Sequence, residues 1–357
     1  MPRRAGEVVA RDRLTSHSHV LPGPSIWTGL FYPHPTPQSS STWFHTSQSM
    51  KLTETQFAKP VNCTTTDAPI LRIALPNKGR LAQDTRDLFN DAGLEVRALS
   101  DRALKASLGG EFEAIFVRAQ DIPEFVADGA ADAGVTGLDL VVESQHDIVS
   151  QLDLRFGRCR LAVAAREESG ISAIEQLPPG TRIATAFPNV TASYFAEIGQ
   201  DVSIVPISGA AEIAPHLGIA DAIVDLVSTG STLKTNGLRE IGTVMWSTAQ
   251  LVVAANRAGW LDTKETALQE LATALDSVTS ARGQRYLMAN VPRDRLPTVR
   301  QILPGLNGPT VIDVLDGGKH VAVHAVVAAS AVYRVISDLK AIGGEGILVT
   351  RIERLMR

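Results

Sequence analysis

The alternation of strand-like and helix-like segments over residues 71–350 restricts the fold of this chain more than any other feature. Short apolar runs typical of buried strands alternate with stretches whose apolar residues recur at helical spacing. The strand-like runs are residues 71–76, 112–117, 132–137, 159–164, 182–185, 202–206, 222–226 and 250–255. This alternation predicts an α/β fold with largely parallel sheets. Ligands of such folds bind at the carboxyl ends of strands, where Asn77, Arg118, Gly137 and Asp225 are expected.

Two helices have predicted start signals. Asp121 with Glu124 forms a predicted capping box that opens a short helix after the second strand. Residues 262–281 predict a long amphipathic helix, and Asp262 and Glu265 are expected to cap its start.

The last segment of the chain has a different order of elements. Strands are expected at 286–291, 310–315, 320–327 and 346–350, and helices at 294–303 and 330–342. The order βαββαβ predicts a ferredoxin-like unit of about seventy residues. Units of this kind bind small regulators or form oligomers, and the fold alone does not choose between these roles.

Residues 1–68 differ in composition from the rest of the chain. They are rich in Ser, Thr, Pro and His and show neither helical nor strand periodicity. Such a segment buries too little apolar surface to offset the entropy lost on ordering. We expect a disordered extension or a start that belongs at Met50, with an organellar transit peptide as a third possibility.

Charge and cysteine content narrow the class of protein. The 34 basic and 38 acidic residues are nearly balanced, so the sequence lacks the excess of positive charge that is typical of proteins that bind nucleic acid or an anionic membrane. No apolar stretch is long enough to span a bilayer. Cys63 and Cys159 lie far apart, and Cys159 falls in an apolar run. We therefore expect a reduced cytoplasmic protein with a buried thiol rather than a disulfide.

Residues 212–238 contain the strongest candidate for a binding site. Glu212 is expected near the start of a helix, and a later apolar strand leads through Asp225 into a small-residue turn that opens a helix at 233–238. The turn consists of Ser228, Thr229, Gly230, Ser231 and Thr232. Its N–H groups and hydroxyls can hold a phosphate, and Asp225 can accept hydrogen bonds from paired sugar hydroxyls. This pattern indicates a ribose 5-phosphate, but a simple helix cap and an ordinary strand end fit the spacing equally well.

The same stretch resembles a known family. The matching positions are Glu212, Gly218, Ala220, Ile223, Asp225, Thr229, Gly230, Thr232 and Leu233. They resemble the signature of ATP phosphoribosyltransferase, the enzyme that opens histidine biosynthesis. The resemblance extends less sharply from about Leu71 to the C-terminus, roughly four-fifths of the chain.

The resemblance implies a domain organisation. The core would have two lobes like those of a periplasmic binding protein, with the chain passing into the second lobe near Ala162 and returning near Gln250. The expected limits are 1–68 for the N-terminal extension, 69–162 with 250–281 for catalytic lobe I, 163–249 for lobe II, and 282–357 for a regulatory domain. The resemblance further implies that this last domain binds histidine as feedback inhibitor and that the chain forms dimers and hexamers.

The resemblance also implies a reaction. The family transfers phosphoribosyl from PRPP to N1 of ATP, releases pyrophosphate and inverts the anomeric carbon. Mg²⁺ would enter on the substrate pyrophosphate, with no metal site in the chain itself. The implied residues are Lys78, Arg80 and Asp225 for catalysis; Asp221, Asp225, Thr229, Gly230, Ser231, Thr232 and Glu212 for PRPP; Arg118 and Gly137 for ATP; and Asn290 and Thr310 for histidine.

Several of these residues have simpler explanations in the sequence alone. Residues 77–80 are compatible with a solvated basic turn, Asp121 with a helix cap, and Glu212 with a favourable charge at a helix start. His216 is better explained as a surface or packing histidine. None of the histidines in residues 71–357 has metal-ligand spacing.

Three other functions remain open. A solute-binding module would use the same two-lobed fold, and it would bind its ligand without releasing pyrophosphate. A phosphoribosyltransferase for another base usually has two adjacent acidic residues before the phosphate turn, whereas Asp221 and Asp225 are spaced here. A catalytically silent regulatory subunit is the third alternative, and the filled signature disfavours it.

Overall fold

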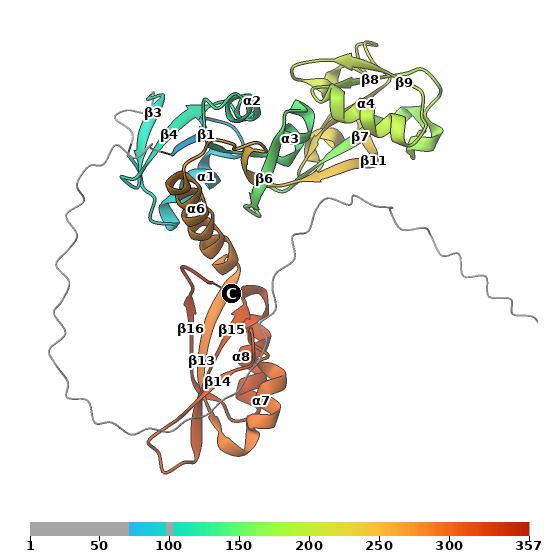
Figure 1. Ribbon diagram of the computed structural model, residues 1–357. Helices are drawn as coiled ribbons and strands as arrows, with labels where there is room; N and C mark the ends of the chain where they lie inside the picture. The colour runs from blue at the N-terminus through green and yellow to red at the C-terminus, as the bar shows by residue number, and fades with distance from the viewer. Residues whose placement is uncertain (1–70, 98–102, 357) are drawn as a thin grey trace, which may run out of the picture. The chain divides into compact units, whose positions relative to one another are not determined.

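The computed structural model describes residues 71–97 and 103–356, which form three β-sheets with their helices (Figure 1). The N-terminal extension expected at residues 1–68 lies outside the described residues. Each sheet has a hydrophobic core of its own.

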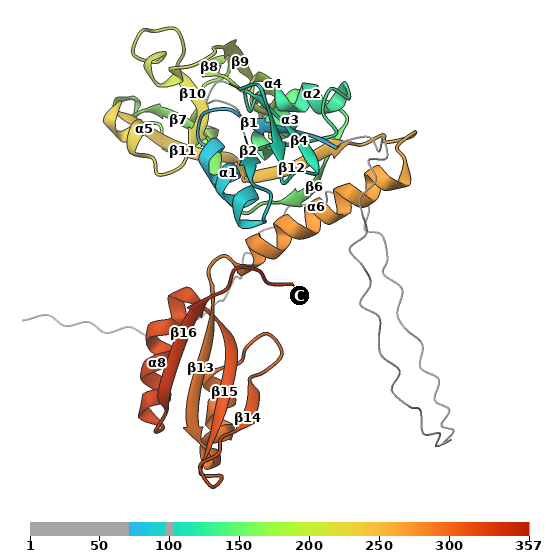
Figure 2. The same ribbon diagram turned by 90° about the vertical axis from the view of Figure 1, so that its left-hand side faces the viewer.

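The first sheet has seven strands in the order β2-β3-β4-β1-β5-β12-β6. Its strands are β1 (Arg72–Pro76), β2 (Val96–Arg97), β3 (Lys105–Leu108), β4 (Phe112–Val117), β5 (Ala133–Gly137), β6 (Ile148–Asp153) and β12 (Ala249–Ala254). The associated helices are α1 (Ala82–Asp91), α2 (Ile122–Ala127), α3 (Leu138–Ser144) and α6 (Asp262–Ala281). Figure 2 shows α6 running beside α1 and this sheet.

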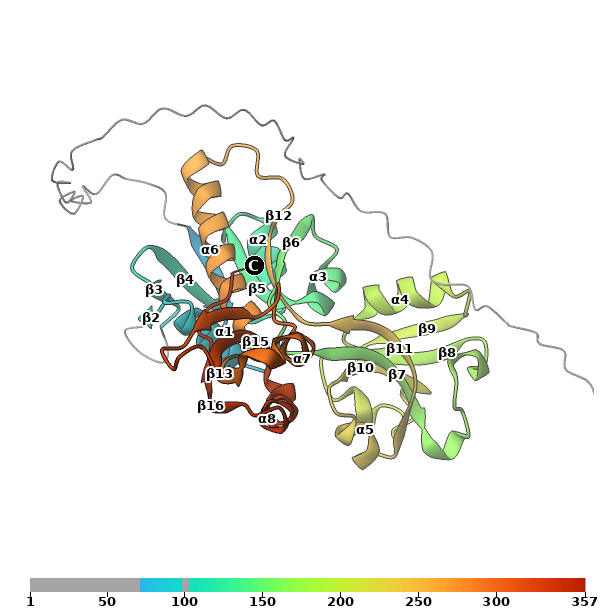
Figure 3. The ribbon, with the colours of Figure 1, turned by 90° about the horizontal axis from the view of Figure 1, so that it is seen from below.

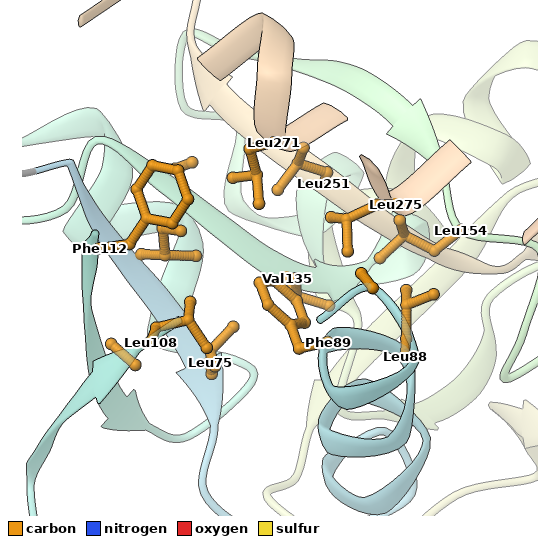
Figure 4. Close-up of a cluster of buried hydrophobic side chains, with 14 of the residues drawn as sticks. Leu75, Leu88, Phe89, Leu108, Phe112, Val135, Leu154, Leu251, Leu271 and Leu275 are labelled. Atoms are coloured by element: carbon orange, nitrogen blue, oxygen red, sulfur yellow. The ribbon is translucent and has the colours of Figure 1, made fainter. Parts of the chain in front are cut away.

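Successive side chains of a strand point to opposite faces of its sheet, so helices can pack on both faces of the first sheet. On one face, Phe89 of α1 and Leu271 of α6 pack with Leu75, Val135 and Leu251 of the strands (Figure 4). The neighbouring strand residues point to the other face, where they pack with Ile122 and Val126 of α2. The sheet is therefore buried on both sides, as its apolar strands predict.

The second sheet has five strands in the order β11-β7-β10-β8-β9. Its elements are β7 (Cys159–Arg166), β8 (Thr181–Thr185), α4 (Pro188–Glu197), β9 (Val202–Pro206), β10 (Ala222–Val227), α5 (Ser231–Thr235) and β11 (Leu238–Ser247), with 3₁₀ turns at Glu167–Ser169, Ile174–Gln176 and Ala211–Ile213. Helices α4 and α5 lie on opposite sides of this sheet (Figure 3). The face under α5 holds the pocket described below.

The chain passes between the first two sheets twice. It leaves the first sheet after β6, at Asp153, and enters the second at the start of β7, at Cys159. It returns between Ser247 at the end of β11 and Ala249 at the start of β12. The domain limits expected from the sequence remain a prediction.

The third sheet confirms the predicted ferredoxin-like unit. Its elements are β13 (Gln284–Pro292), a 3₁₀ turn (Arg293–Arg295), α7 (Leu296–Ile302), β14 (Thr310–Asp313), β15 (His320–Ala328), a 3₁₀ turn (Ala329–Ala331), α8 (Val332–Ala341) and β16 (Glu345–Arg351). The strand order is β14-β15-β13-β16, and both helices contribute to the core on one face. The fold class is thus α/β, with a core of two sheets and a C-terminal ferredoxin-like domain.

The expectation of largely parallel sheets is wrong, because both larger sheets are mixed. β1 is parallel to β4 and β5, but β12 runs antiparallel to β5 and to β6. β3 and β4 are antiparallel because only residues 109–111 connect them, and a connection so short cannot make a parallel crossover. Gly109 and Gly110 both have positive φ in this turn, at 65° and 85°.

The predicted side-chain capping is also wrong, although Asp121 does occupy the N-cap position of α2. Asp121 precedes α2 with φ −89° and ψ −15°, a helical conformation, and its side chain makes no capping hydrogen bond. A capping side chain reaches the first turn when its own backbone is extended. Leu261, not Asp262, is the N-cap residue of α6, and no side chain caps that helix. Both Asp262 and Glu265 lie in the first turn of α6, where negative charge is favourable.

Two predicted helices differ from the structure. Glu212 lies in a three-residue 3₁₀ turn rather than at the start of an α-helix. The helix expected at 233–238 is α5, which ends at Thr235, and Gly237 with φ 60° turns the chain into β11. Strand β11 was not predicted, and two register shifts in its pairing with β7 explain why its alternation is weak in the sequence.

Candidate functional site

A cavity of about 190 Å³ lies where β10 ends and α5 begins. The residues that line it are Glu212, Asp225, Leu226, Val227, Ser228, Thr229, Gly230, Thr232 and Leu233. The structure thus brings five predicted site residues together, namely Glu212, Asp225, Thr229, Gly230 and Thr232. Every hydroxyl group in this lining belongs to residues 228–232, which follow β10 directly.

The loop between β10 and α5 owes its shape to one glycine and two hydroxyls. Gly230 has φ 80°, the left-handed conformation that a glycine adopts without strain. The hydroxyls of Thr229 and Ser231 lie 3.0 Å apart, and the Ser231 N–H donates to Thr229 Oγ1 at 3.4 Å. Ser231 supports the loop in this way but does not line the cavity.

Asp225 is the carboxyl group nearest to this loop along β10. Burial raises the pKa of Asp225, the backbone N–H of Leu226 opposes that rise, and the nearby Glu212 carboxylate adds to it. The Leu226 N–H donates to Asp225 Oδ1 at 2.7 Å. Asp225 therefore enters the cavity as a hydrogen-bond acceptor whose charge is incompletely compensated by its neighbours.

Asp221 is not brought into the cavity. It precedes β10, four positions before Asp225, and the strand places the two at different points along its length. The Asp221 carboxylate accepts hydrogen bonds from the Arg182 backbone N–H at 2.9 Å and from Arg182 Nη2 at 2.8 Å. This partner holds the pKa of Asp221 below its usual range.

An ion pair that the sequence analysis missed supports the start of the loop. Arg160 of β7 donates through Nε to Glu240 of β11 at 2.7 Å, and a second contact joins Nη2 to the same carboxylate. Arg160 Nη1 also lies 3.4 Å from the Ser228 carbonyl oxygen. The pair is partly buried and raises the pKa of Arg160 while lowering that of Glu240. The sequence contains one sign of this ion pair, because Arg160 is a charged residue inside the apolar run 159–164.

A second group of predicted residues lies at one edge of the first sheet. The Asn77 N–H donates to the Val117 carbonyl at 2.8 Å, so residues 77–80 and Arg118 follow neighbouring parallel strands. Gly137 ends β5, the next parallel strand on the other side of β1. Lys78 and Arg118 are exposed there. The carboxyl ends of these strands thus bring Lys78, Arg80, Arg118 and Gly137 to one edge, as expected for parallel neighbours.

Arg80 points toward the segment that connects the two sheets. Its Nη1 donates to the carbonyl oxygen of Gly157, and its Nη2 lies 4.0 Å from Asp139 Oδ1. Within the described residues, no hydrogen bond or ion pair joins Lys78 or Arg80 to residues 228–232.

The two residues predicted for the third sheet lie on the same face of that sheet. Asn290 of β13 is paired with Ala322, and Thr310 of β14 is paired with His324, both on β15. Because Ala322 and His324 are two positions apart on one strand, Asn290 and Thr310 flank β15 on a common face. The Tyr286 hydroxyl and His324 Nδ1 are hydrogen-bonded on that face at 2.8 Å.

Other expectations concern single residues and the absence of special sites. Cys159 is buried and free, as predicted, and Cys63 lies outside the described residues. His216 is exposed and hydrogen-bonded to the Asn236 carbonyl at 2.7 Å. Over residues 71–97 and 103–356, no group of three His, Cys, Asp or Glu side chains is arranged to hold a metal. None of the helices in these ranges has the length and apolarity that a membrane crossing requires.

Comparison with known proteins is informative over most of the chain. The family model described as ATP phosphoribosyltransferase matches residues 118–277, and the model described as HisG, C-terminal domain, matches residues 281–354. The ATP phosphoribosyltransferase of Gemmatimonas aurantiaca is 66% identical over 292 residues, covering 80% of this chain and 100% of that protein. That of Natronomonas pharaonis is 50% identical over 287 residues, with the same coverage of each chain.

A solved structure from Thermotoga maritima is similar in both fold and sequence. The ATP phosphoribosyl transferase (HisG:HisZ) complex from Thermotoga maritima contains a chain that is 28% identical with a TM-score of 0.51. The alignment covers 59% of this chain and 99% of that chain.

Proposed function

Because this chain belongs to the ATP phosphoribosyltransferase family, we propose that it transfers the phosphoribosyl group of PRPP to N1 of ATP and releases pyrophosphate. Members of this family are phosphoribosyltransferases, enzymes of the glycosyltransferase class, and act in histidine biosynthesis. The observation that carries the proposal is the cavity that unites Asp225 with the hydroxyl-rich loop after β10.

The cavity after β10 is proposed to hold the ribose 5-phosphate part of PRPP. Thr229, Gly230 and Thr232 would donate backbone N–H and hydroxyl hydrogen bonds to the 5-phosphate, with Ser231 supporting the loop. Asp225 would accept hydrogen bonds from the ribose hydroxyls, and Glu212 lines the same cavity. Hydrogen bonds to a charged acceptor are stronger than neutral ones, which suits a carboxylate for gripping a diol.

Departure of pyrophosphate dominates the chemical step. The transition state resembles an oxocarbenium ion, so catalysis depends on positioning and on neutralising the leaving charge rather than on a strong nucleophile. Lys78 and Arg80 are the proposed cations for the pyrophosphate. Mg²⁺ would arrive bound to the pyrophosphate of PRPP and would be part of the substrate. N1 of adenine already has a lone pair, so the attack on the anomeric carbon requires no side-chain base.

The nucleotide would bind near the edge of the first sheet. Arg118 can pair with phosphate oxygens in a bidentate manner, and Gly137 is proposed to contact the nucleotide at the end of β5. Both residues follow strands next to β1, whose own loop contains Lys78 and Arg80. ATP and PRPP are therefore proposed to meet between this edge and the cavity after β10.

The C-terminal domain is proposed to bind histidine as feedback inhibitor. Asn290 and Thr310 share one face of the third sheet, which supports a common ligand there. We further propose that the chain acts in the cytoplasm and forms homo-oligomers, dimers or hexamers, without nucleic acid or membrane partners.

Pyrophosphate release by the purified chain with PRPP, ATP and Mg²⁺, measured with and without histidine, tests these proposals. Release that requires ATP and falls on addition of histidine is the expected result. A folded chain that binds PRPP but releases no pyrophosphate would instead support a solute-binding module or a silent subunit. Release that histidine leaves unchanged would contradict the regulatory assignment alone.

A further inference from the structure

A buried carboxyl group lies where the chain passes between the first two sheets. Asp139, in the first turn of α3, is only 1% exposed. Its Oδ1 accepts a hydrogen bond from the Ser247 hydroxyl, and its backbone N–H donates to Ser247 Oγ at 3.1 Å. Its Oδ2 is buried and has no hydrogen-bond partner among the described residues. A buried polar atom without a partner is rare in folded proteins and points to a role beyond packing.

Arg80 is the cation that faces this carboxyl group. Its Nη2 lies 4.0 Å from Asp139 Oδ1, and its Nη1 donates to the Gly157 carbonyl. The Arg80 side chain is 34% exposed, whereas that of Asp139 is 1% exposed. The guanidinium therefore has one edge turned to the interior and another turned to solvent.

Two glycines leave the space that this pair occupies. A Cβ atom added at Gly137 would collide with Asp139 Oδ1. A Cβ atom added at Gly157, whose φ is 63°, would lie 3.1 Å from Arg80 Nη1 and would collide with Leu81. Side chains at these two positions would push Asp139 and Arg80 out of their present arrangement.

We propose that Asp139 is a positioning residue for phosphoribosyl transfer, which holds the guanidinium of Arg80 between the buried carboxylate and the Gly157 carbonyl. This inference rests on the proposed function, in which Arg80 neutralises the leaving pyrophosphate. A guanidinium has five N–H donors in a rigid planar fork, so fixing its inner edge sets the direction of the outer donors. Asp139 does not touch the substrate and acts through Arg80.

The position of Arg80 also couples two parts of the site. Gly157 belongs to the segment between β6 and β7. Three residues later, Arg160 contacts the Ser228 carbonyl at the start of the loop between β10 and α5. Residues 157–160 therefore connect the proposed pyrophosphate cation to the loop after β10. Displacement of Arg80 is expected to lower the rate of transfer more than the affinity for ATP, because no hydrogen bond or ion pair within the described residues joins Arg118 to Arg80 or Asp139.

The test compares Asp139→Asn with the matched control Ser247→Ala. Asp139→Asn keeps the shape of the side chain and removes its charge, whereas Ser247→Ala removes a hydrogen bond to the same carboxyl group and leaves the charge. We expect kcat for pyrophosphate release to fall about 10- to 100-fold in Asp139→Asn with the KM for ATP unchanged. In Ser247→Ala we expect kcat to stay within about threefold of the unmodified chain. Should Asp139→Asn not fold, Asp139→Ser, which leaves room for a water, takes its place with the same expectation.

Chemical rescue distinguishes positioning from a purely structural role. Guanidinium ion added to Arg80→Ala is expected to restore part of the lost kcat, because the ion can occupy the vacated site beside Asp139. The same addition to the Arg80→Ala, Asp139→Asn double variant is expected to restore none. Equal rescue of both variants, or an unchanged kcat in Asp139→Asn, would overturn the inference while leaving the proposed function intact. Absence of pyrophosphate release by the unmodified chain would overturn both.

Discussion

Replacement of Asp225 by asparagine should raise stability and abolish most activity, because this residue is both desolvated and proposed to grip the ribose. Asparagine keeps the size of the side chain and removes its charge. The introduced amide is expected to retain the contact with the Leu226 N–H through its carbonyl oxygen, since that donor lies 2.7 Å from Asp225 Oδ1. The amide nitrogen would then face the cavity, which places a donor where the ribose hydroxyls require an acceptor.

The loss of activity can be estimated from the hydrogen bonds that this change removes. Hydrogen bonds to a charged group contribute about 1.5–3 kcal/mol each, so two of them amount to about 3 kcal/mol or more. At about 1.4 kcal/mol per factor of ten, kcat/KM for PRPP should fall by at least about 100-fold. The measurement is pyrophosphate release with PRPP varied at saturating ATP. An unchanged kcat/KM for PRPP would remove Asp225 from the site.

The stability of the same variant should depend on pH. Burial raises the pKa of Asp225 in the folded chain above its ordinary value of 3.8, so folding favours the protonated carboxyl. The folded state is therefore destabilised as pH rises from the ordinary pKa toward the folded pKa, and asparagine removes this cost. Asp225→Asn should have the higher Tm at neutral pH, and the difference should vanish at a pH below 3.8. A lower Tm for the variant at neutral pH would contradict the desolvation argument.

Three further substitutions test the loop after β10, its supporting ion pair and the core of the first sheet. Thr232→Val removes one hydroxyl from the cavity and should raise the KM for PRPP about tenfold, because one hydrogen bond is lost. A raised KM for ATP alone would contradict the assignment of Thr232 to PRPP. Arg160→Lys breaks the forked contact with Glu240 and the contact with the Ser228 carbonyl. Steady-state kinetics should therefore show a higher KM for PRPP at an unchanged KM for ATP. Equal changes in both KM values would argue against a role specific to the loop. Leu271→Ala leaves a cavity between α6 and the first sheet and should lower the free energy of unfolding by about 2–5 kcal/mol in denaturant titrations. Leu261→Ala is the exposed control and should change the free energy of unfolding by less than about 0.5 kcal/mol.

Most strands could be predicted from the sequence because their apolar runs are short, continuous and bounded by polar residues. Strand β4 and helix α6 have the predicted bounds, and the βαββαβ order of the C-terminal domain was predicted in full. Strand direction was harder to predict, because a pattern of apolar residues does not record where a chain returns from another sheet. β12 illustrates this point, since it enters the first sheet from β11 and runs antiparallel to β5.

The cavity after β10 was predictable because its parts are close together in the chain. Asp225 and residues 228–232 belong to one strand, turn and helix, so local chemistry was sufficient to group them. Contacts between distant residues left no such signal. Arg182 and Asp221 are 39 positions apart, Arg160 and Glu240 are 80 apart, and Ser247 and Asp139 are 108 apart. The first of these pairs holds Asp221 outside the cavity, and the last holds Asp139 in its position beside Arg80. Because the two partners of each pair are far apart in sequence, only the folded chain brings them together.

Identification of the reaction product is the direct test of phosphoribosyl transfer to N1 of ATP. The chain would be incubated with PRPP, Mg²⁺ and ATP labelled with ¹⁵N in the adenine ring, and the purified product examined by mass spectrometry and by ¹H–¹⁵N correlation spectroscopy. We expect one added phosphoribosyl group per ATP, with the new anomeric proton correlated to N1. Pyrophosphate release without ribosylated ATP, or a correlation to a different nitrogen, would contradict this expectation.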